Sequence, residues 1–297
     1  METLESLRAK MESAEDLHSI ARTMKVMASV NIRQYETALE SLVEYSRTIE
    51  LGLQIILQSE TQIISGMESV SGGAFGAVVI GANQGMAGQF SNRVVSYALR
   101  GMDRLTTPSE TRHVMVVGLR TAAHFEFAGY AMDHVIPSAS SLAGVTNSVL
   151  QVLLRVEKWR EQNDVQRIVL FFNTPTSGAS FHSRMRWLLP ADLDWLRDLQ
   201  ATSWDSRGLP IFTMDRDRLF SALLHQYFFV LLYRAFVESL TSENASRLSS
   251  MQAAEQNIED RLDELTTRYH HLRQSSITEE LLDITSGFEA LTDLDGQ

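Results

Sequence analysis

Residues 18–36 read HSIARTMKVMASVNIRQYE, and one face of this stretch repeats every seven residues. The repeat runs through eight uncharged positions: Leu7, Ala14, Ala21, Ala28, Tyr35, Leu42, Ile49 and Ile56. A companion series runs beside it: Leu4, Met11, His18, Met24 or Lys25, Ile32, Leu39, Ser46 and Leu53. A heptad sustained this long predicts a left-handed coiled coil with a partner helix. A helix over most of residues 3–58 would be roughly 80 Å long, more than a domain core can enclose.

The C-terminal stretch, from about Asp215 to Phe288, is the natural partner. It contains no proline, and no glycine lies between Gly208 and Gly287, so a very long helix is possible. Asp215 is suited to cap its start, and Gly287 lies near its expected end. Its first third is apolar nearly all round, which predicts burial against more than one neighbour.

The rest of this stretch carries a single seam with one irregularity. The seam residues are Met251, Ile258, Leu265 and Leu272, interleaved with Leu262 and Tyr269. The next seam residue, Ile277, comes after a step of five instead of three or four, and the repeat then resumes through Ile284 and Leu291. Either the slip presents polar residues to another chain, or it is a stutter that relaxes the supercoil. The stripes alone are also compatible with the core of a helical bundle.

The middle of the chain changes period. Four β-rich runs, at 74–81, 112–118, 130–137 and 166–172, alternate with helical patterns, and 180–190 is suited to an edge strand. This alternation predicts an α/β domain with a largely parallel sheet. The expected organisation is therefore an N-terminal coiled-coil helix (1–58), a central Rossmann-like α/β domain (73–207) and a C-terminal coiled-coil helix (213–291).

Composition narrows the function. The 297 residues carry a net charge of −11, which disfavours binding to nucleic acid or anionic membranes. There are no cysteines, so disulfides and thiol chemistry are excluded. The N-terminus lacks the apolar core of a signal peptide, and the most apolar run, YFFVLLY at 227–233, is too short to span a bilayer. We expect a soluble chain.

No motif predicts catalysis. GANQGMAGQF at 81–90 is a glycine-rich turn after a strand, but its spacing is neither a dinucleotide fingerprint nor a Walker loop, so a tight strand-to-helix turn is favoured over nucleotide binding. The adjacent His270 and His271 point to different helix faces and make a poor chelating pair. Glu279, Glu280 and Asp283 have no matching base or nucleophile. We expect no catalytic site, no cofactor and no metal.

Five motifs, in order along the whole chain, resemble the γ subunit of F-type ATP synthases. They are HSIARTMKVMASVNIRQYE (18–36), GANQGMAGQF (81–90), Trp204-Asp205, the run from Ala245 to Met251 with Ala253, Ala254 and Asn257, and RQSSITEELLDITSGFEA (273–290). There are departures: the first helix is acidic, Asn31 replaces a common lysine, Phe288 replaces an alanine, and the segment after Trp204-Asp205 lacks the family's foot on the membrane ring. Divergence of this kind is similar to that of the alternative N-type F-ATPases.

The resemblance implies a central rotor shaft without a catalytic site. Residues 1–58 and 213–290 would form an antiparallel coiled coil inside a ring of α and β subunits. The chain would be one copy of a non-catalytic subunit in a proton- or sodium-translocating ATP synthase complex. Its partners would be the α, β and ε subunits and the membrane c-ring, with no nucleic acid. The complex would lie on the cytoplasmic face of the bacterial inner membrane, with this chain as a peripheral membrane protein.

The resemblance also implies contacts with the β subunits. Arg273, Gln274 and Thr278 would point outward and hydrogen-bond their catch loops, a role that suits the rigid donor fork of arginine. Met24, Lys25 and Arg247 match family positions where β meets the shaft. Two rival interpretations remain: a Rossmann-like enzyme with helical dimerisation arms, which a nucleotide titration would detect, and a helical scaffold, which would not stimulate ATP hydrolysis by an α/β ring.

Overall fold

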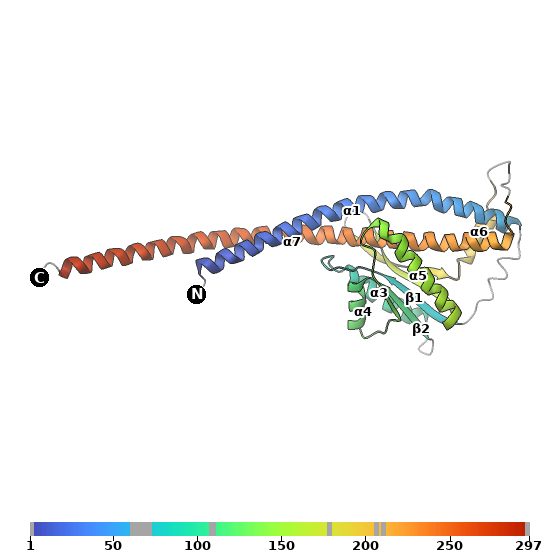
Figure 1. Ribbon diagram of the computed structural model, residues 1–297, viewed down its shortest axis with the longest axis horizontal. Helices are drawn as coiled ribbons and strands as arrows, with labels where there is room; N and C mark the ends of the chain where they lie inside the picture. The colour runs from blue at the N-terminus through green and yellow to red at the C-terminus, as the bar shows by residue number, and fades with distance from the viewer. Residues whose placement is uncertain are drawn as a thin grey trace. The chain divides into compact units, whose positions relative to one another are not determined.

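The computed structural model describes residues 3–59, 73–106, 111–176, 180–204, 208 and 212–294, with side chains up to residue 286. Figure 1 shows its elements. In chain order they are α1 (Leu4–Ser59), β1 (Ala74–Ile80), α3 (Phe90–Leu105), β2 (Arg112–Val117), α4 (Leu119–Phe127), β3 (His134–Ile136), α5 (Leu142–Asn163), β4 (Val165–Pro175), β5 (Phe181–Leu189), α6 (Leu193–Ala201) and α7 (Arg216–Leu294). The predicted class, an α/β domain with two long terminal helices, is confirmed.

The sheet has five strands in the order β3-β2-β1-β4-β5. The β3–β2, β2–β1 and β1–β4 pairs are parallel, whereas β5 runs antiparallel to β4 at the edge. The expected edge strand at 180–190 is therefore present. The expected strand at 130–137 is reduced to His134–Ile136, since Tyr130–Asp133 forms no ladder with β2.

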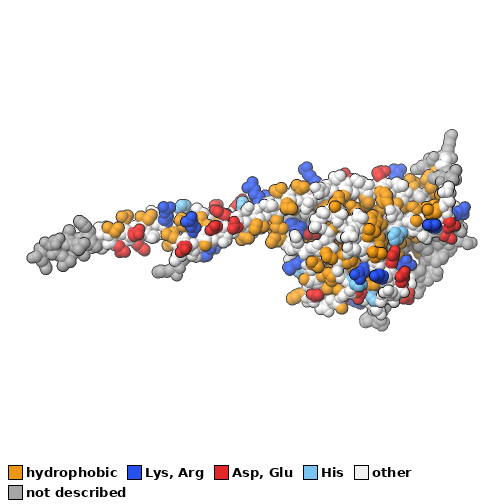
Figure 2. All heavy atoms as spheres, in the orientation of Figure 1, with side chains coloured by type: hydrophobic (Ala, Val, Ile, Leu, Met, Phe, Trp, Pro, Cys, Tyr) orange, Lys and Arg blue, Asp and Glu red, His pale blue; other side chains and the backbone are white. Residues whose placement is uncertain are grey.

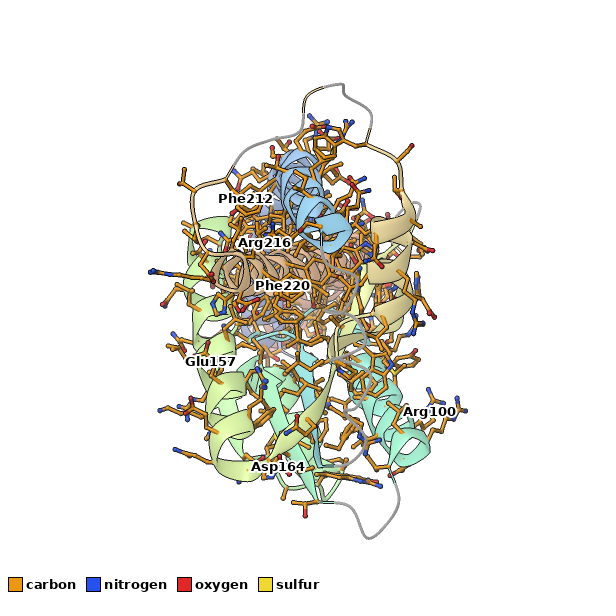
Figure 3. The ribbon with its side chains drawn as sticks, turned by 90° about the vertical axis from the view of Figure 1, so that its right-hand side faces the viewer. Arg100, Glu157, Asp164, Phe212, Arg216 and Phe220 are labelled. Atoms are coloured by element: carbon orange, nitrogen blue, oxygen red, sulfur yellow. The ribbon has the colours of Figure 1, made fainter. Side chains whose placement is uncertain are left out.

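Side chains of β1 alternate between two apolar layers. Phe75, Ala77 and Val79 pack against α3 and α4, whereas Val78 and Ile80 pack against α5, α1 and α7. This alternation is the strand period of two acting on a sheet that is covered on both faces. Figure 3 shows the arrangement end-on, with Glu157 of α5 and Arg100 of α3 on opposite sides of the strands.

Contacts divide the chain into two compact units, one of Met1–Val26 with Ser249–Gln297 and one of Met27–Leu248. Both long helices contribute to both units, and they are antiparallel in each. In the larger unit, Asn31 bonds Asn244 at 3.3 Å and Tyr45 bonds Gln226 at 2.6 Å, so the second number falls as the first rises. The heptad stripes of α1 and α7 thus face each other. The stripes belong to a helix pair and not to the core of a helical bundle.

The start of α7 is capped as predicted. The Asp215 carboxylate accepts the backbone N–H of Arg218 at 3.2 Å, and the Asp215 carbonyl accepts Leu219 N at 2.9 Å. The other end differs from the expectation, because the helix continues past Gly287 to Leu294. A single glycine costs a helix only about 1 kcal/mol, so the residues around Gly287 can carry the helix through it.

Within the described residues, one helix, α7, is long and apolar enough to cross a membrane by length and composition alone, with an 18-residue window of mean hydropathy 1.3. This is weak evidence for a span, because core helices pass the same test. The most apolar part of α7 is a core helix of this kind. Leu232, Phe236 and Val237 are fully buried in the layer between α7 and the sheet.

The packing of α3 on the sheet gives a first prediction. A Cβ at Gly101 would lie 2.5 Å from Cε1 of Phe171, so Gly101→Ala should overpack this layer and lower the free energy of unfolding by about 1–3 kcal/mol. Gly144→Ala in α5 is the matched control, because its Cβ would meet Ala139 at an ordinary 3.5 Å. Urea unfolding of the two variants measures the difference, and equal stabilities would contradict this packing.

The antiparallel register gives a second prediction. The chain contains no cysteine, so a pair of introduced cysteines is the only possible disulfide. Asn31→Cys with Asn244→Cys should cross-link within one chain on mild oxidation, seen as faster migration on a non-reducing gel. Arg33→Cys with Asn244→Cys is the control, because Arg33 is exposed on another face of α1. Equal yields from both pairs would refute the register.

Candidate functional site

In the smaller unit, the helices meet along the seam that the sequence spacing selects. On α1, Leu7 and Ala21 are 1% and 4% exposed, and on α7, Met251 and Leu265 are 7% and 3% exposed. The other seam members described here are half-buried: Leu4, Met11, Ala14 and His18 on α1, and Ile258, Leu262, Tyr269 and Leu272 on α7. Small residues such as Ala21 let the two backbones approach closely. The predicted heptad seam is confirmed.

Polar pairs flank the seam. Lys25 of α1 donates to the Glu255 carboxylate, and His18 lies 3.1 Å from the Glu259 carboxylate. The hydrogen bond from Lys25 holds the pKa of Glu255 below its ordinary value. Because these pairs join α1 to α7, they fix the register of the two helices.

The same cluster has the composition of a metal site. His18, Glu255 and Glu259 bring ligand atoms within 4.8 Å of one another, and imidazole with two carboxylates is a set that zinc uses. However, the ammonium group of Lys25 already neutralises Glu255, and it would repel a cation at that carboxylate. We therefore assign the cluster to cross-helix ion pairing.

The pairing ends where the heptad slips. Fourteen residues back from His18 is Leu4, where α1 begins, and fourteen residues on from its partner Glu259 is Arg273. Antiparallel helices of equal rise therefore place Leu4 level with Arg273. The step of five between Leu272 and Ile277 falls at this level, so no residue of α1 among those described lies beyond it to continue the seam.

Beyond Ser275, the described side chains of α7 are exposed. Ile277, Leu281, Leu282 and Ile284 are 48%, 59%, 61% and 68% exposed. Apolar side chains also reach solvent on α1, where Leu17 and Ile20 are 57% and 51% exposed. Figure 2 shows such hydrophobic side chains at the surface of the long helices, among Lys, Arg, Asp and Glu. An apolar surface of this kind marks contact with another molecule.

The six predicted contact residues occupy different environments. Arg273, Gln274 and Thr278 are exposed on consecutive turns of α7, and the Thr278 hydroxyl donates to the Gln274 carbonyl at 2.9 Å. Met24 and Lys25 are half-buried beside the seam. Eighteen residues of α7, about 27 Å, separate Arg273 from Glu255, the partner of Lys25. These residues therefore lie at two levels of the helix pair and do not form one site.

Arg247, the sixth residue, is buried in the larger unit. Its guanidinium donates to the Glu243 carboxylate at 2.6 Å and to the Gly85 carbonyl at 3.4 Å. Burial raises the pKa of Glu243, while the Arg247 charge opposes that rise. The neighbouring Ser246 hydroxyl donates to the Ala87 carbonyl at 2.7 Å. This part of α7 is thus bonded to the glycine turn.

Two further serines extend the contact to the strand ends. Ser239 donates to the carbonyl of Ile80, the last residue of β1, at 3.3 Å. Ser242 donates to the carbonyl of Asn173 in β4 at 3.2 Å. Neither these serines nor Glu243 is predicted from the sequence patterns. The signal was present, because serines at 239, 242 and 246 repeat at three and four and so share one helix face.

This contact decides between the two interpretations of the glycine turn. The chain leaves β1 for β2 on one side and later places β4 on the other, so a topological switch point lies between β1 and β4. Open α/β sheets bind ligands outside the carboxyl ends of the strands at such a point. Here α7 occupies that position and bonds carbonyls of β1, β4 and the turn. A tight strand-to-helix turn is the interpretation that the geometry supports.

Comparison with known proteins agrees with this architecture. Residues 3–291 match a family described as ATP synthase. The ATP synthase gamma chain of Granulibacter bethesdensis is 26% identical, over 98% of this chain and all (100%) of the relative, and that of Nautilia profundicola is 21% identical over 98% and 99%. Among solved structures, a Euglena gracilis mitochondrial ATP synthase assembly (OSCP/F1/c-ring) contains a chain with TM-score 0.64 and 20% identity, covering 97% of this chain and 94% of that chain.

The buried pair on α7 gives a third prediction. Glu243→Gln leaves the Arg247 charge without its counterion, so it should cost about 3–5 kcal/mol of unfolding free energy. Arg247→Met instead leaves Glu243 buried without its cation, and the double variant should lose less than the sum of the two. Urea unfolding of all three variants, as a double-mutant cycle, measures the coupling, and additive losses would contradict it.

The pH dependence of Arg247→Met has a definite sign. The pKa of Glu243 is already raised in the fold, and removing Arg247 removes the charge that lowers it. The folded chain then binds a proton that the unfolded chain releases above its ordinary pKa of 4.5. Stability of this variant should fall as the pH rises above 4.5, more steeply than in the parent chain. Parallel profiles would show that Glu243 is not the titrating group.

Proposed function

Because the chain belongs to the ATP synthase family, we propose that it is the gamma subunit of an F-type ATP synthase, the central rotor shaft. It couples ion flow through a membrane ring to ATP synthesis or hydrolysis at the β subunits, and it has no catalytic site of its own. The observation that carries the proposal is the single-helix end of α7. There the seam loses its partner, and Ile277, Leu281 and Ile284 need another chain to cover them.

A shaft must be stiff and must differ from one face to another. Stiffness comes from α1 and α7, which pair with each other in both units. Asymmetry comes from faces that differ in chemistry, such as the exposed Leu17 and Ile20 against the ion-paired Lys25 and Glu255. Turning such a shaft within a ring presents each β subunit with a different surface in turn. Those differential contacts bias the conformation, and hence the nucleotide affinity, of each β subunit.

The proposed β-subunit contacts fall into two groups. Arg273, Gln274 and Thr278 are exposed near the level of Leu4, where α1 begins, and the exposed Arg273 guanidinium can meet a carboxylate in bidentate fashion. Met24 and Lys25 lie beside the seam, where Lys25 already pairs with Glu255, so a partner would share or replace that bond. Arg247 is buried, so its contribution would be to hold the glycine turn in place.

The proposed partners are the α, β and ε subunits and the c-ring, with one copy of this chain per complex. That assembly would place it on the cytoplasmic face of a bacterial inner membrane. The acidic start of the chain and its other departures support the N-type subclass. Asp205 and Phe288, which bear on the foot and on that subclass, lie outside the residues or side chains that the structure describes.

Reconstitution tests the proposal. The chain is added to its cognate α and β subunits, and ATP hydrolysis is assayed together with the mass of the complex. One copy per ring of six, with stimulated hydrolysis, is the expected result. A chain that stays out of the complex, when α and β are demonstrably competent, would reject the rotor proposal.

Arg273 gives a fourth prediction. Arg273→Ala should lower hydrolysis by the reconstituted complex by about tenfold or more, since the loss of a charge-assisted hydrogen bond is worth about 1.5–3 kcal/mol. Arg268→Ala is the matched control, because Arg268 is an exposed arginine on the same helix and faces solvent beside the paired segment. Complex mass separates weakened assembly from weakened coupling. Equal activity of the two variants would remove Arg273 from the contact.

A further inference from the structure

The sheet has one long open edge. Among the described residues, β4 is the only strand that pairs with β5, so the outer side of Phe181–Leu189 has no neighbouring strand. An edge strand of nine residues presents backbone donors and acceptors that another extended segment can use. The two faces of β5 differ in chemistry, and this difference defines the segment that would fit.

One face of β5 is basic. The side chains of Arg184 and Arg186, two residues apart, lie on the same face of β5. They line a groove of about 800 Å³ together with Arg197 of α6 and Arg234 of α7. Arg184 is exposed, and among the described residues no hydrogen bond or ion pair to its guanidinium is found. Asp192 and Asp194 also line the groove, but Asp192 accepts the first N–H groups of α6 and Asp194 pairs with Arg197. Arg234 pairs with Glu238 at 2.8 Å, and Arg186 lies beside Tyr227. The unpaired positive charge on the strand is therefore that of Arg184, with Arg186 next to it.

The other face of β5 is aromatic and apolar. Phe181 packs against Phe90, with ring centroids 5.5 Å apart, and Trp187 meets Phe75 at 6.4 Å. Phe181, Met185 and Trp187 are only partly buried, so an added strand would find apolar surface to cover. Adjacent strands interact through directly opposed side chains on the same face. A basic face and an apolar face on one edge strand therefore specify a complementary strand.

We propose that the β5 edge binds an extended segment of another polypeptide in which acidic and apolar residues alternate. The segment adds to the sheet as a sixth strand, with its carboxylates toward Arg184 and Arg186 and its apolar side chains over Phe181, Met185 and Trp187. The site lies within the larger unit, and it does not depend on the rotor function. The chain itself carries a net charge of −11, so this basic strip stands out as a local attractor for an acidic partner.

A competing role for the arginines is protection. Charged side chains on an edge strand also prevent sheets from joining, and then no segment would bind there. Two features favour recognition over protection. The arginines lie on a single face of β5 beside a groove large enough for side chains, and Met185 and Trp187 of the other face also line this groove and are only partly buried. An edge strand that only prevents sheets from joining would be better protected by charged side chains on both faces.

The test uses the full-length chain and synthetic peptides. An eight-residue peptide of alternating glutamate and valine should bind with a dissociation constant in the micromolar range, measured by fluorescence anisotropy at low salt. Binding should slow amide hydrogen exchange in residues 181–189. Arg184→Glu should weaken binding at least tenfold, whereas Arg268→Glu, an exposed arginine in the other unit, should leave it unchanged.

Two control peptides separate the alternatives. A lysine–valine peptide should not bind. A peptide with the same glutamates but with proline in place of two central valines cannot donate to a strand ladder, so it should bind at least tenfold more weakly. Equal binding of the proline peptide would overturn strand addition in favour of simple ion pairing. No binding by the glutamate–valine peptide would overturn the proposal and assign the arginines to edge protection.

Discussion

The antiparallel pairing of α1 with α7 is the constraint on which the rest of the structure depends. Each helix carries one apolar stripe, and a stripe on an isolated helix cannot be buried without a partner. Because the repeat of seven occurs in both helices, the two stripes can face each other, and in the smaller unit ion pairs such as Lys25–Glu255 hold the register. The length of α1 then decides where α7 becomes solitary. The position of Leu4 thus sets the exposure of Ile277 and the residues that follow it.

A second consequence of that pairing is that α7 changes its chemistry along its length. Around Leu232 and Phe236 it is an apolar core helix against the sheet. From Ser239 to Arg247 its inward face is polar, and it bonds the strand ends and the glycine turn through hydroxyls and a guanidinium. After Met251 it carries a single narrow seam. One helix therefore contributes a face of different chemistry to each of the two units.

Periodicity predicted the parts of the structure that repeat. The seams of α1 and α7, the order of strands and helices, and the edge strand at 180–190 all follow from spacing, because each depends on a local apolar pattern. The hydrogen bonds from α7 to the strand ends and the glycine turn were not predicted, although Ser239, Ser242 and Ser246 share a helix face. Serine adds nothing to an apolar pattern, and the carbonyls that accept these bonds lie far away in the sequence. The end of α7 was misplaced, because the weak helix propensity of Gly287 is only a small local cost.

The candidate contact residues were predicted from family motifs. The structure supports some of these predictions more than others. Exposure of Arg273 and Thr278 is what a partner contact requires, but exposure is common on a solitary helix. The burial of Arg247 could not be anticipated from its motif, since burial depends on Gly85, which is 162 residues away in the sequence. Side-chain environments of this kind are set by tertiary packing, which a linear pattern does not encode.

The separation of the two paired segments also has a consequence for how the chain is made. His18 meets Glu259 across 241 residues, so α1 leaves the ribosome long before its partner exists. Synthesis at about 5–20 residues per second leaves that gap open for roughly 10–50 seconds. During this interval the apolar face of α1 has no cognate surface, whereas the α/β region can already fold. Nascent α1 is therefore the segment that most needs shielding, and the stretch of α7 up to Leu272 completes the pairing by closing over a helix made first.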